Sequence, residues 1–226
     1  MFIFSVVNSF AQQTFDGSFV MTFINVNGND TLYSPLLWCK KGKRIAIEIQ
    51  DKGKLRGISQ RVLIDPADST WSMILDASNA KNAARVHAAK MFRDTITTQL
   101  FKVTRTSSSK NISGFTCKKT IIESRQFKTE LWITEQLNFN LGAVYRIIEH
   151  CGMMSSYIPK GDWCWWNNKK GMVIQVIVFD KATSKNYKMS LSAIKAGKVD
   201  NNLFDLKNFV IAEIPEGQHC GISNKK

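Results

Sequence analysis

Hydrophobic and polar residues alternate along several short stretches of the chain. Ile45, Ile47 and Ile49 fall at every second position, and Glu48 and Gln50 occupy positions between and after them. The same apolar spacing recurs at Phe19, Met21 and Phe23, and again at Leu131 and Ile133. A period of two places side chains on alternate faces of a strand, so the pattern predicts a sheet with one buried face and one wet face.

Turn residues join these stretches into hairpins. Residues 61–65 and 70–75 flank "PADS", whose Pro66 and Asp68 suit a turn. A second hairpin is predicted over 115–124 and 127–134, and a third over 172–180 and 186–194. The stretch "KVTRTSSSKNISG" is polar throughout and is interpreted as a loop. The count predicts about ten or eleven mainly antiparallel strands in one sheet or barrel.

Two segments have helical spacing instead. In "TEQLNFNLGAVYRIIEHCG", apolar residues recur every three or four positions, with Thr134 as a candidate N-cap and Gly152 where the helix would end. The alanine-rich "DASNAKNAARVHAAKMF" predicts a second helix, capped by Asp76 or Ser78. A large sheet with two helices can hide its apolar face by curving around them.

The first residues, "MFIFSVVNSFAQQ", form an apolar run that ends in small residues before Gln12, as a signal-peptidase site does. The run lacks a positively charged start, and the alternative is a first strand or a frayed terminus. We interpret residues 1–11 as the remainder of a signal peptide and residues 12–226 as a single domain. The expected location is the periplasm or cell envelope of a Gram-negative bacterium.

The net charge of +13 and the pI near 9.6 favour an anionic partner such as a membrane surface, an acidic ligand or nucleic acid. The lysines are scattered in pairs, however, which also suits a solvated surface and strand edges protected from pairing with other chains.

The five cysteines allow at most two disulfides in an exported protein. Cys151 and Cys164 bracket a short loop and are the favoured pair, and Cys39 and Cys117 would form a second. Two His-Cys pairs, at 150–151 and 219–220, lack the spacing of metal ligands, so no metal or other cofactor is predicted.

Three segments carry a family resemblance. The first is "ISGFTCKKTIIESRQFKTELWIT", in which an I-x-G-[YF]-x-C-x-[KR] strand leads to a strand that ends W-[VI]-T. The others are "RVLIDPADSTWSMILD" and the tail "VDNNLFDLKNFVIAEIPEGQ". Together they resemble the domain-of-unknown-function family 4412, which is similar to the periplasmic lipoprotein carriers LolA and LolB. The resemblance implies a strongly curved sheet or half-open barrel with two helices on its concave side.

The chain departs from this family in an insertion, "GMMSSYIPKGDWCWWNN", rich in methionine and tryptophan. Flexible methionines and flat aromatic rings suit an apolar contact such as an acyl chain, although such a loop can also fill the barrel as its core. The predicted ligand-binding residues are Leu141, Tyr145 and Ile148 on the helix, and Met153, Met154, Trp163, Trp165 and Trp166 in the insertion.

No catalytic motif is present: the sequence has no G-x-S-x-G elbow, no phosphate-binding glycine loop and no H-E-x-x-H. We therefore expect an exported, non-catalytic protein that binds a hydrophobic ligand such as a lipid or a lipoprotein acyl chain. The first alternative is an envelope structural or interaction protein with a filled barrel. A basic binder of single-stranded nucleic acid is a further alternative. Nucleic acid is not an expected partner, however, because an exported protein is separated from the nucleic acid of the cytoplasm.

Overall fold

The structure is a computed structural model that describes residues 14–26, 35–50, 58–77, 80–87, 101–142, 144 and 171–215. Within these residues, twelve strands form one sheet in the order β12-β6-β5-β4-β3-β2-β1-β11-β10-β9-β8-β7. The strands are β1 (Gly17–Asn25), β2 (Leu36–Lys41), β3 (Arg44–Ile49), β4 (Ile58–Asp65), β5 (Thr70–Ala77), β6 (Ala80–His87), β7 (Lys102–Ile112), β8 (Phe115–Glu123), β9 (Phe127–Thr134), β10 (Met172–Asp180), β11 (Lys185–Ala196) and β12 (Val210–Ile214). A short 3-10 helix, η2 (Asn201–Phe204), lies between β11 and β12.

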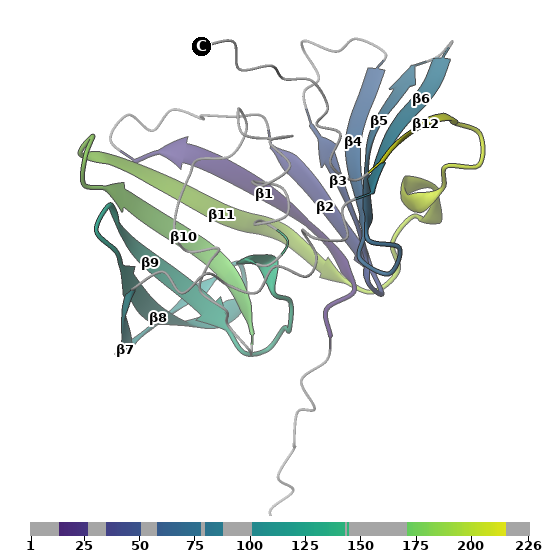
Figure 1. The fold of residues 1–226 in the computed structure, drawn as a ribbon. Helices are drawn as coiled ribbons and strands as arrows, with labels where there is room; N and C mark the ends of the chain where they lie inside the picture. The colour runs from purple at the N-terminus through teal and green to yellow at the C-terminus, as the bar shows by residue number, and fades with distance from the viewer. Residues whose placement is uncertain are drawn as a thin grey trace, which may run out of the picture.

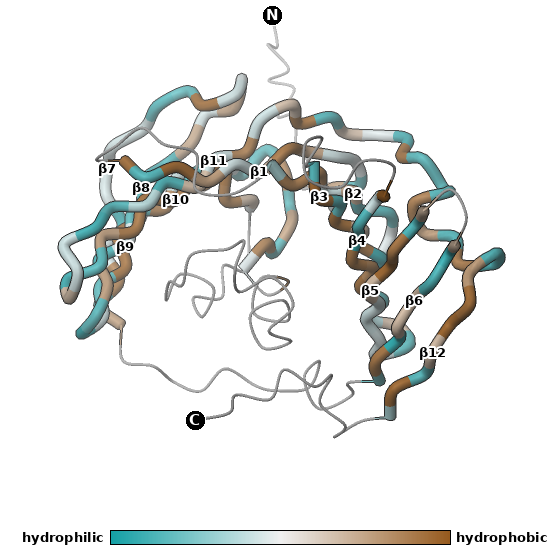
Figure 2. Tube along the Cα trace, turned by 90° about the horizontal axis from the view of Figure 1, so that it is seen from above, coloured by the Kyte–Doolittle hydropathy of each residue, from teal (hydrophilic) through white to brown (hydrophobic). Residues whose placement is uncertain are grey.

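The sheet is open and strongly curved (Figure 1). Seen from above, its strands follow an arc with β7–β9 at one end and β5, β6 and β12 at the other (Figure 2). Neighbouring strands pair antiparallel except β12, which pairs parallel to β6. The predicted mainly β class and curved single sheet are therefore confirmed, and the sheet is mixed.

The strand register places two sets of side chains on opposite faces. Phe19 pairs with Trp38, and Trp38 pairs with Ile47, so these apolar residues share one face. The residues between them along each strand point to the other face, where Leu63 and Ile74 pack against Phe204. The segment that carries Phe204 runs outside the arc (Figure 2), so we call this the outer face and the opposite, concave one the inner face.

The three predicted hairpins are confirmed as β4–β5, β8–β9 and β10–β11. In the first, the Asp65 carboxylate accepts a hydrogen bond from the Ala67 N–H at 3.2 Å. In the third, the Asp180 carboxylate accepts from the Ala182 N–H at 2.9 Å. Aspartate side chains that bond the backbone two residues ahead stabilise turns locally, which is why these hairpins could be predicted.

The predicted helix over 76–92 is wrong within the described residues. Asp76, the candidate cap, lies in β5, and residues 80–87 form β6. Every residue of β6 pairs with β5, from Ala80 opposite Ala77 to His87 opposite Thr70. Helix preference differs between residues by less than about 1 kcal/mol, so this ladder of hydrogen bonds outweighs the preference of alanine for helix.

The predicted helix over 134–152 does not begin at Thr134, which is the last residue of β9. Asn138 and Phe139 instead make isolated bridges to Thr14 and Met172. Leu141, Gly142 and Val144 are helical, and the rest of the predicted helix lies outside the described residues. Two helices on the concave side are therefore not supported.

The polar stretch interpreted as a loop is an edge strand, β7. It pairs with β8 from Lys102 to Ile112, with an irregularity between Arg105 and Ser109. Nearly all of its residues are exposed, so the apolar alternation that reveals a strand is missing. With this strand the described sheet has twelve strands, against the predicted ten or eleven.

The predicted disulfide between Cys39 and Cys117 is wrong, because both are buried free thiols. Cys39 is in β2 and Cys117 is in β8, and β1, β11, β10 and β9 separate these strands. Strands lie about 4.8 Å apart, so the Cα atoms are far beyond the 7 Å that a disulfide can bridge. Cys151 and Cys164, the favoured pair, lie outside the described residues.

Candidate functional site

The inner face of the sheet is a continuous apolar surface. Its register runs without a break from Leu131 through Val176 and Met189 to Phe23. Strands β1–β5 and β9–β11 all contribute to one cluster of buried side chains, which includes Phe19, Met21, Phe23, Leu36, Trp38, Ile45, Ile47, Val62, Ile64, Trp71, Leu131, Val176, Met189 and Leu191.

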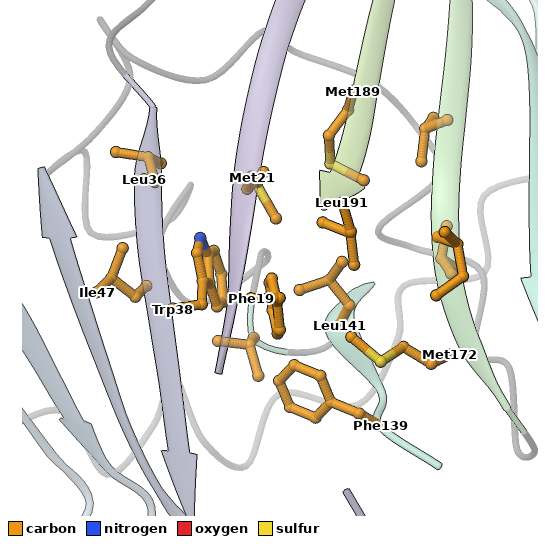
Figure 3. Packing of buried hydrophobic residues seen from close by; sticks show 14 of the residues in the cluster. Phe19, Met21, Leu36, Trp38, Ile47, Phe139, Leu141, Met172, Met189 and Leu191 are labelled. Carbon is orange, nitrogen blue, oxygen red and sulfur yellow. The ribbon is translucent and has the colours of Figure 1, made fainter. Parts of the chain in front are cut away.

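Aromatic rings pack at the centre of this face (Figure 3). Phe19 stacks on Trp38 with 5.6 Å between ring centroids and 18° between planes. Phe139 lies 6.1 Å from the Phe19 ring, and Leu141 beside it is 1% exposed. The segment that follows β9 therefore covers the centre of the inner face with its own apolar side chains.

Leu141 is the one predicted ligand-binding residue that the structure describes. It lies on the inner face near Met172 and Leu191, as the prediction requires (Figure 3). The other predicted residues lie outside the described residues, namely Tyr145, Ile148, Met153, Met154, Trp163, Trp165 and Trp166.

Two tryptophans give the inner face a polar component. The indole nitrogens of Trp38 and Trp71 are buried and have no hydrogen-bond partner within the described part of the chain. Buried tryptophan N–H groups usually find an acceptor. These two donors would favour a ligand that carries an oxygen acceptor among its apolar groups.

The strands at the β7 end carry positive charge on the outer face. The Lys110 ammonium lies 4.0 Å from the centroid of the Trp132 ring and donates a hydrogen bond to Gln175 Oε1 at 2.9 Å. Desolvation against these groups, followed by repulsion from Lys188, lowers the pKa of Lys110. Lys119 lies 5.6 Å from the same ring. This end of the sheet thus concentrates cations against one indole ring.

A groove on the outer face, beside η2, was missed by the sequence analysis. It consists of two cavities, of about 660 Å³ and about 390 Å³, which share Asn202 and Asp205. The signal was present in the apolar residues that interrupt the wet face of the sheet, Leu37, Cys39 and Leu63. Their presence shows that a second layer covers part of that face, which the alternation at Glu48 and Gln50 concealed.

The described residues contain neither a metal-binding cluster nor a membrane-spanning helix. Across the described ranges, no three His, Cys, Asp or Glu side chains are grouped so that they could hold a metal ion. No helix in the described part of the chain has the length and hydrophobicity needed to cross a membrane.

Comparison with solved structures shows distant likeness in fold. The structure of PNGF-II matches with a TM-score of 0.51 and 13% identity, over 89% of this chain and 32% of that one. The chain therefore spans about a third of the length of PNGF-II, and at this identity only the fold is shared. A DUF1329 family protein from Desulfovibrio piger ATCC 29098 has a TM-score of 0.24 at 11% identity, covering 86% of this chain and 91% of that one. A domain named for outer membrane lipoprotein sorting, from Vibrio parahaemolyticus, has 0.23 at 11%, covering 84% and 89%.

Comparison of the sequence itself gives a firmer result. No curated protein matches the chain at a significant level. The family model described as "Domain of unknown function (DUF4412)" matches residues 15–208, which include β1 to β11 and η2. The strand at 115–123 and its partner at 127–134, which carry the motif seen in the sequence, form the adjacent pair β8–β9. The chain belongs to the DUF4412 family.

Proposed function

We propose that this protein binds a hydrophobic ligand on the inner face of its sheet and acts as an exported carrier without catalysis. The observation that carries the proposal is the mainly apolar surface formed by β1–β5 and β9–β11 on the concave side of an open sheet. Concave, mainly apolar surfaces with a few placed polar groups are typical of small-molecule sites. The similarity of the DUF4412 family to the LolA and LolB carriers supports the same function.

The ligand class is a lipid or a lipoprotein acyl chain. Long alkyl chains fit an extended apolar face. The indole N–H groups of Trp38 and Trp71, which have no acceptor among the described residues, suit an ester or carboxyl oxygen. The net charge of +13 would attract the protein to anionic head groups at a membrane surface. We place this function in the periplasm or cell envelope.

A second function is favoured by one observation. Phe19 and Trp38 are 1% exposed, and Phe139 packs directly on Phe19. If the remaining inner face is filled in the same way, the sheet serves as a scaffold, and the protein is an envelope structural or interaction protein.

One experiment separates the two functions. The full chain is purified from the periplasm of an expressing bacterium, its mass is measured under native conditions, and bound lipid is extracted with solvent and identified. A carrier retains lipid in a fixed stoichiometry. A scaffold has the mass of the bare chain, which does not change after incubation with phospholipid vesicles.

A matched pair of variants assigns the bound lipid to the inner face. Met21 is fully buried on the inner face, whereas its neighbour Val20 is partly buried and points the other way. Met21→Gln should lower the amount of lipid retained, and Val20→Gln should leave it unchanged. Equal retention by both variants would contradict an inner-face site.

A further inference from the structure

The groove beside η2 has walls fixed by hydrogen bonds. The Asp200 carboxylate accepts a hydrogen bond from the Asn202 N–H at 2.9 Å and caps the 3-10 turn. From the sheet, Lys41 Nζ donates to Asn201 Oδ1 at 2.6 Å, and Arg44 Nη2 donates to the Phe204 carbonyl at 2.5 Å. The turn is thus tied to β2 and β3, so the cavities on either side of it have fixed positions.

Arg61, on β4, lines the smaller cavity and has no anionic partner among the described residues. Its side chain is mostly buried, at 7% exposed for the residue, and lines the cavity of about 390 Å³. Unlike Lys41 and Arg44, it forms no hydrogen bond or ion pair with any described residue, and its Nε has no partner. Among the described residues, its one specific contact is with the Phe209 ring, whose centroid lies 5.3 Å from the guanidinium carbon.

The carboxylate nearest to Arg61 along the strand register is already engaged. Glu48 on β3 pairs directly with Arg61, yet its oxygens accept hydrogen bonds from Ser59 Oγ at 2.8 Å and Gln50 Nε2 at 3.1 Å. A buried charge without a hydrogen-bonded partner is costly, so proteins rarely retain one for stability alone. The guanidinium is therefore available to a ligand.

The other groups in the cavity define the chemistry of that ligand. The lining holds two cations and three carboxylates: Arg61, Lys81, Asp76, Asp200 and Asp205. Because carboxylates and cations are mixed in this lining, a neutral ligand is favoured over a simple anion, and no described cluster suits a metal ion. The side-chain amides of Asn202 and Asn208, which both donate and accept, make no hydrogen bond to a described residue.

A ligand that fits must supply acceptors to Arg61 and donors to the carboxylates at closely spaced points. Hydroxyl groups do both. The second cavity, of about 660 Å³, continues the groove past Asn202 and Asp205, which gives room for more than one sugar ring. We propose that the outer groove between η2, β4 and β5 binds a neutral oligosaccharide, with Arg61 as its central hydrogen-bond donor. This site is separate from the inner face and does not depend on the hydrophobic ligand.

The test uses the full chain against an array of neutral and sulfated oligosaccharides, followed by calorimetric titration with the neutral oligosaccharide that gives the highest signal. Arg61→Met removes the donor and keeps a long apolar side chain. Arg85→Met is the matched control. Arg85 is on the same outer face in β6, its Nη1 lies 2.9 Å from Glu213 Oε1, and it lines neither cavity. Asn208→Ala is a second groove variant, whose side chain makes no described hydrogen bond that folding would lose.

The expected result is binding of at least one neutral oligosaccharide by the wild type. The affinity should fall about tenfold or more in Arg61→Met, because hydrogen bonds from charged groups are the strong ones. It should fall by a smaller factor in Asn208→Ala and stay unchanged in Arg85→Met. The proposal is overturned if no neutral oligosaccharide binds, if Arg61→Met and Asn208→Ala both bind as the wild type does, or if only sulfated oligosaccharides bind in a salt-sensitive way.

Discussion

Replacing Arg61 by methionine should make the unliganded protein more stable. Arg61 as a whole is 7% exposed, and its buried Nε has no hydrogen-bond partner within the described residues. A buried polar group left unsatisfied costs about 1–3 kcal/mol of folding free energy. Methionine removes that group and can pack against the apolar residues of the outer face, among them Leu63 and Phe209.

The gain is reduced by one lost contact. The cation–π interaction of Arg61 with Phe209, at 5.3 Å, is worth about 0.5–2 kcal/mol. The balance predicts that Arg61→Met raises the free energy of unfolding by about 1 kcal/mol. Arg85→Met serves as the control and should lower it by about 0.2–1 kcal/mol, because it breaks a largely exposed ion pair with Glu213.

Urea denaturation, followed by far-UV circular dichroism in the absence of sugars, measures this difference. With a denaturant slope of about 1–3 kcal/mol per molar, the midpoint of Arg61→Met should move up by roughly 0.3–1 M. A midpoint lowered by a similar amount would show that the guanidinium stabilises the fold. In that case the argument that Arg61 is kept for a ligand fails.

Three further predictions concern the sheet. Gly17→Ala should destabilise the fold by about 1–3 kcal/mol in the same assay, since φ is +153° and an added Cβ would lie 2.1 Å from the Lys195 carbonyl oxygen. Burial, followed by the charges of nearby carboxylates, raises the pKa of Cys39 to about 11. Iodoacetamide at pH 8 should therefore label Cys39 in urea but not in the native protein. Equal labelling rates in the two states, measured by peptide mass spectrometry, would contradict this. Burial opposes ionisation of Asp16, but hydrogen bonds from Lys40 and the Gly42 N–H outweigh it and lower the pKa of Asp16. Asp16→Asn should therefore lower the free energy of unfolding by about 0.5 kcal/mol above pH 3.8. In urea denaturation, the difference between wild type and variant should vanish as the pH falls through the lowered pKa of Asp16 in the folded state. A difference that persists in acid would refute this.

The two faces of the sheet offer different chemistry. The inner face presents mainly aliphatic and aromatic side chains with isolated indole donors, whereas the outer groove presents carboxylates, amides, two guanidinium groups and two ammonium groups. Because a strand directs successive side chains to opposite faces, neighbouring residues such as Val62 and Arg61 belong to different surfaces. Variants at adjacent positions can therefore test each face without altering the other.

The amino-acid sequence alone determined the features that depend on local interactions. Alternation at Ile45, Ile47 and Ile49 predicted a strand with a buried face, and all three residues belong to the inner cluster or pack against it. Asp65 predicted a hairpin because its carboxylate bonds the backbone of its own turn. The motif that ends in Thr134 likewise predicted the family, which the match over residues 15–208 confirms.

Only the tertiary structure decided the features that depend on partners distant in the sequence. The segment 80–87 has a helical pattern but becomes a strand, because β5 lies beside one edge and β12, which is far along the chain, pairs with the other. The edge strand β7 has no apolar alternation, since almost none of it is buried. The environment of Arg61 was also hidden, because Phe209 and Asp200 approach it only after the chain has crossed the sheet and returned over the outer face. Which distant segments pair and pack is not set by either segment alone, so the sequence predicted the inner face and missed the outer groove.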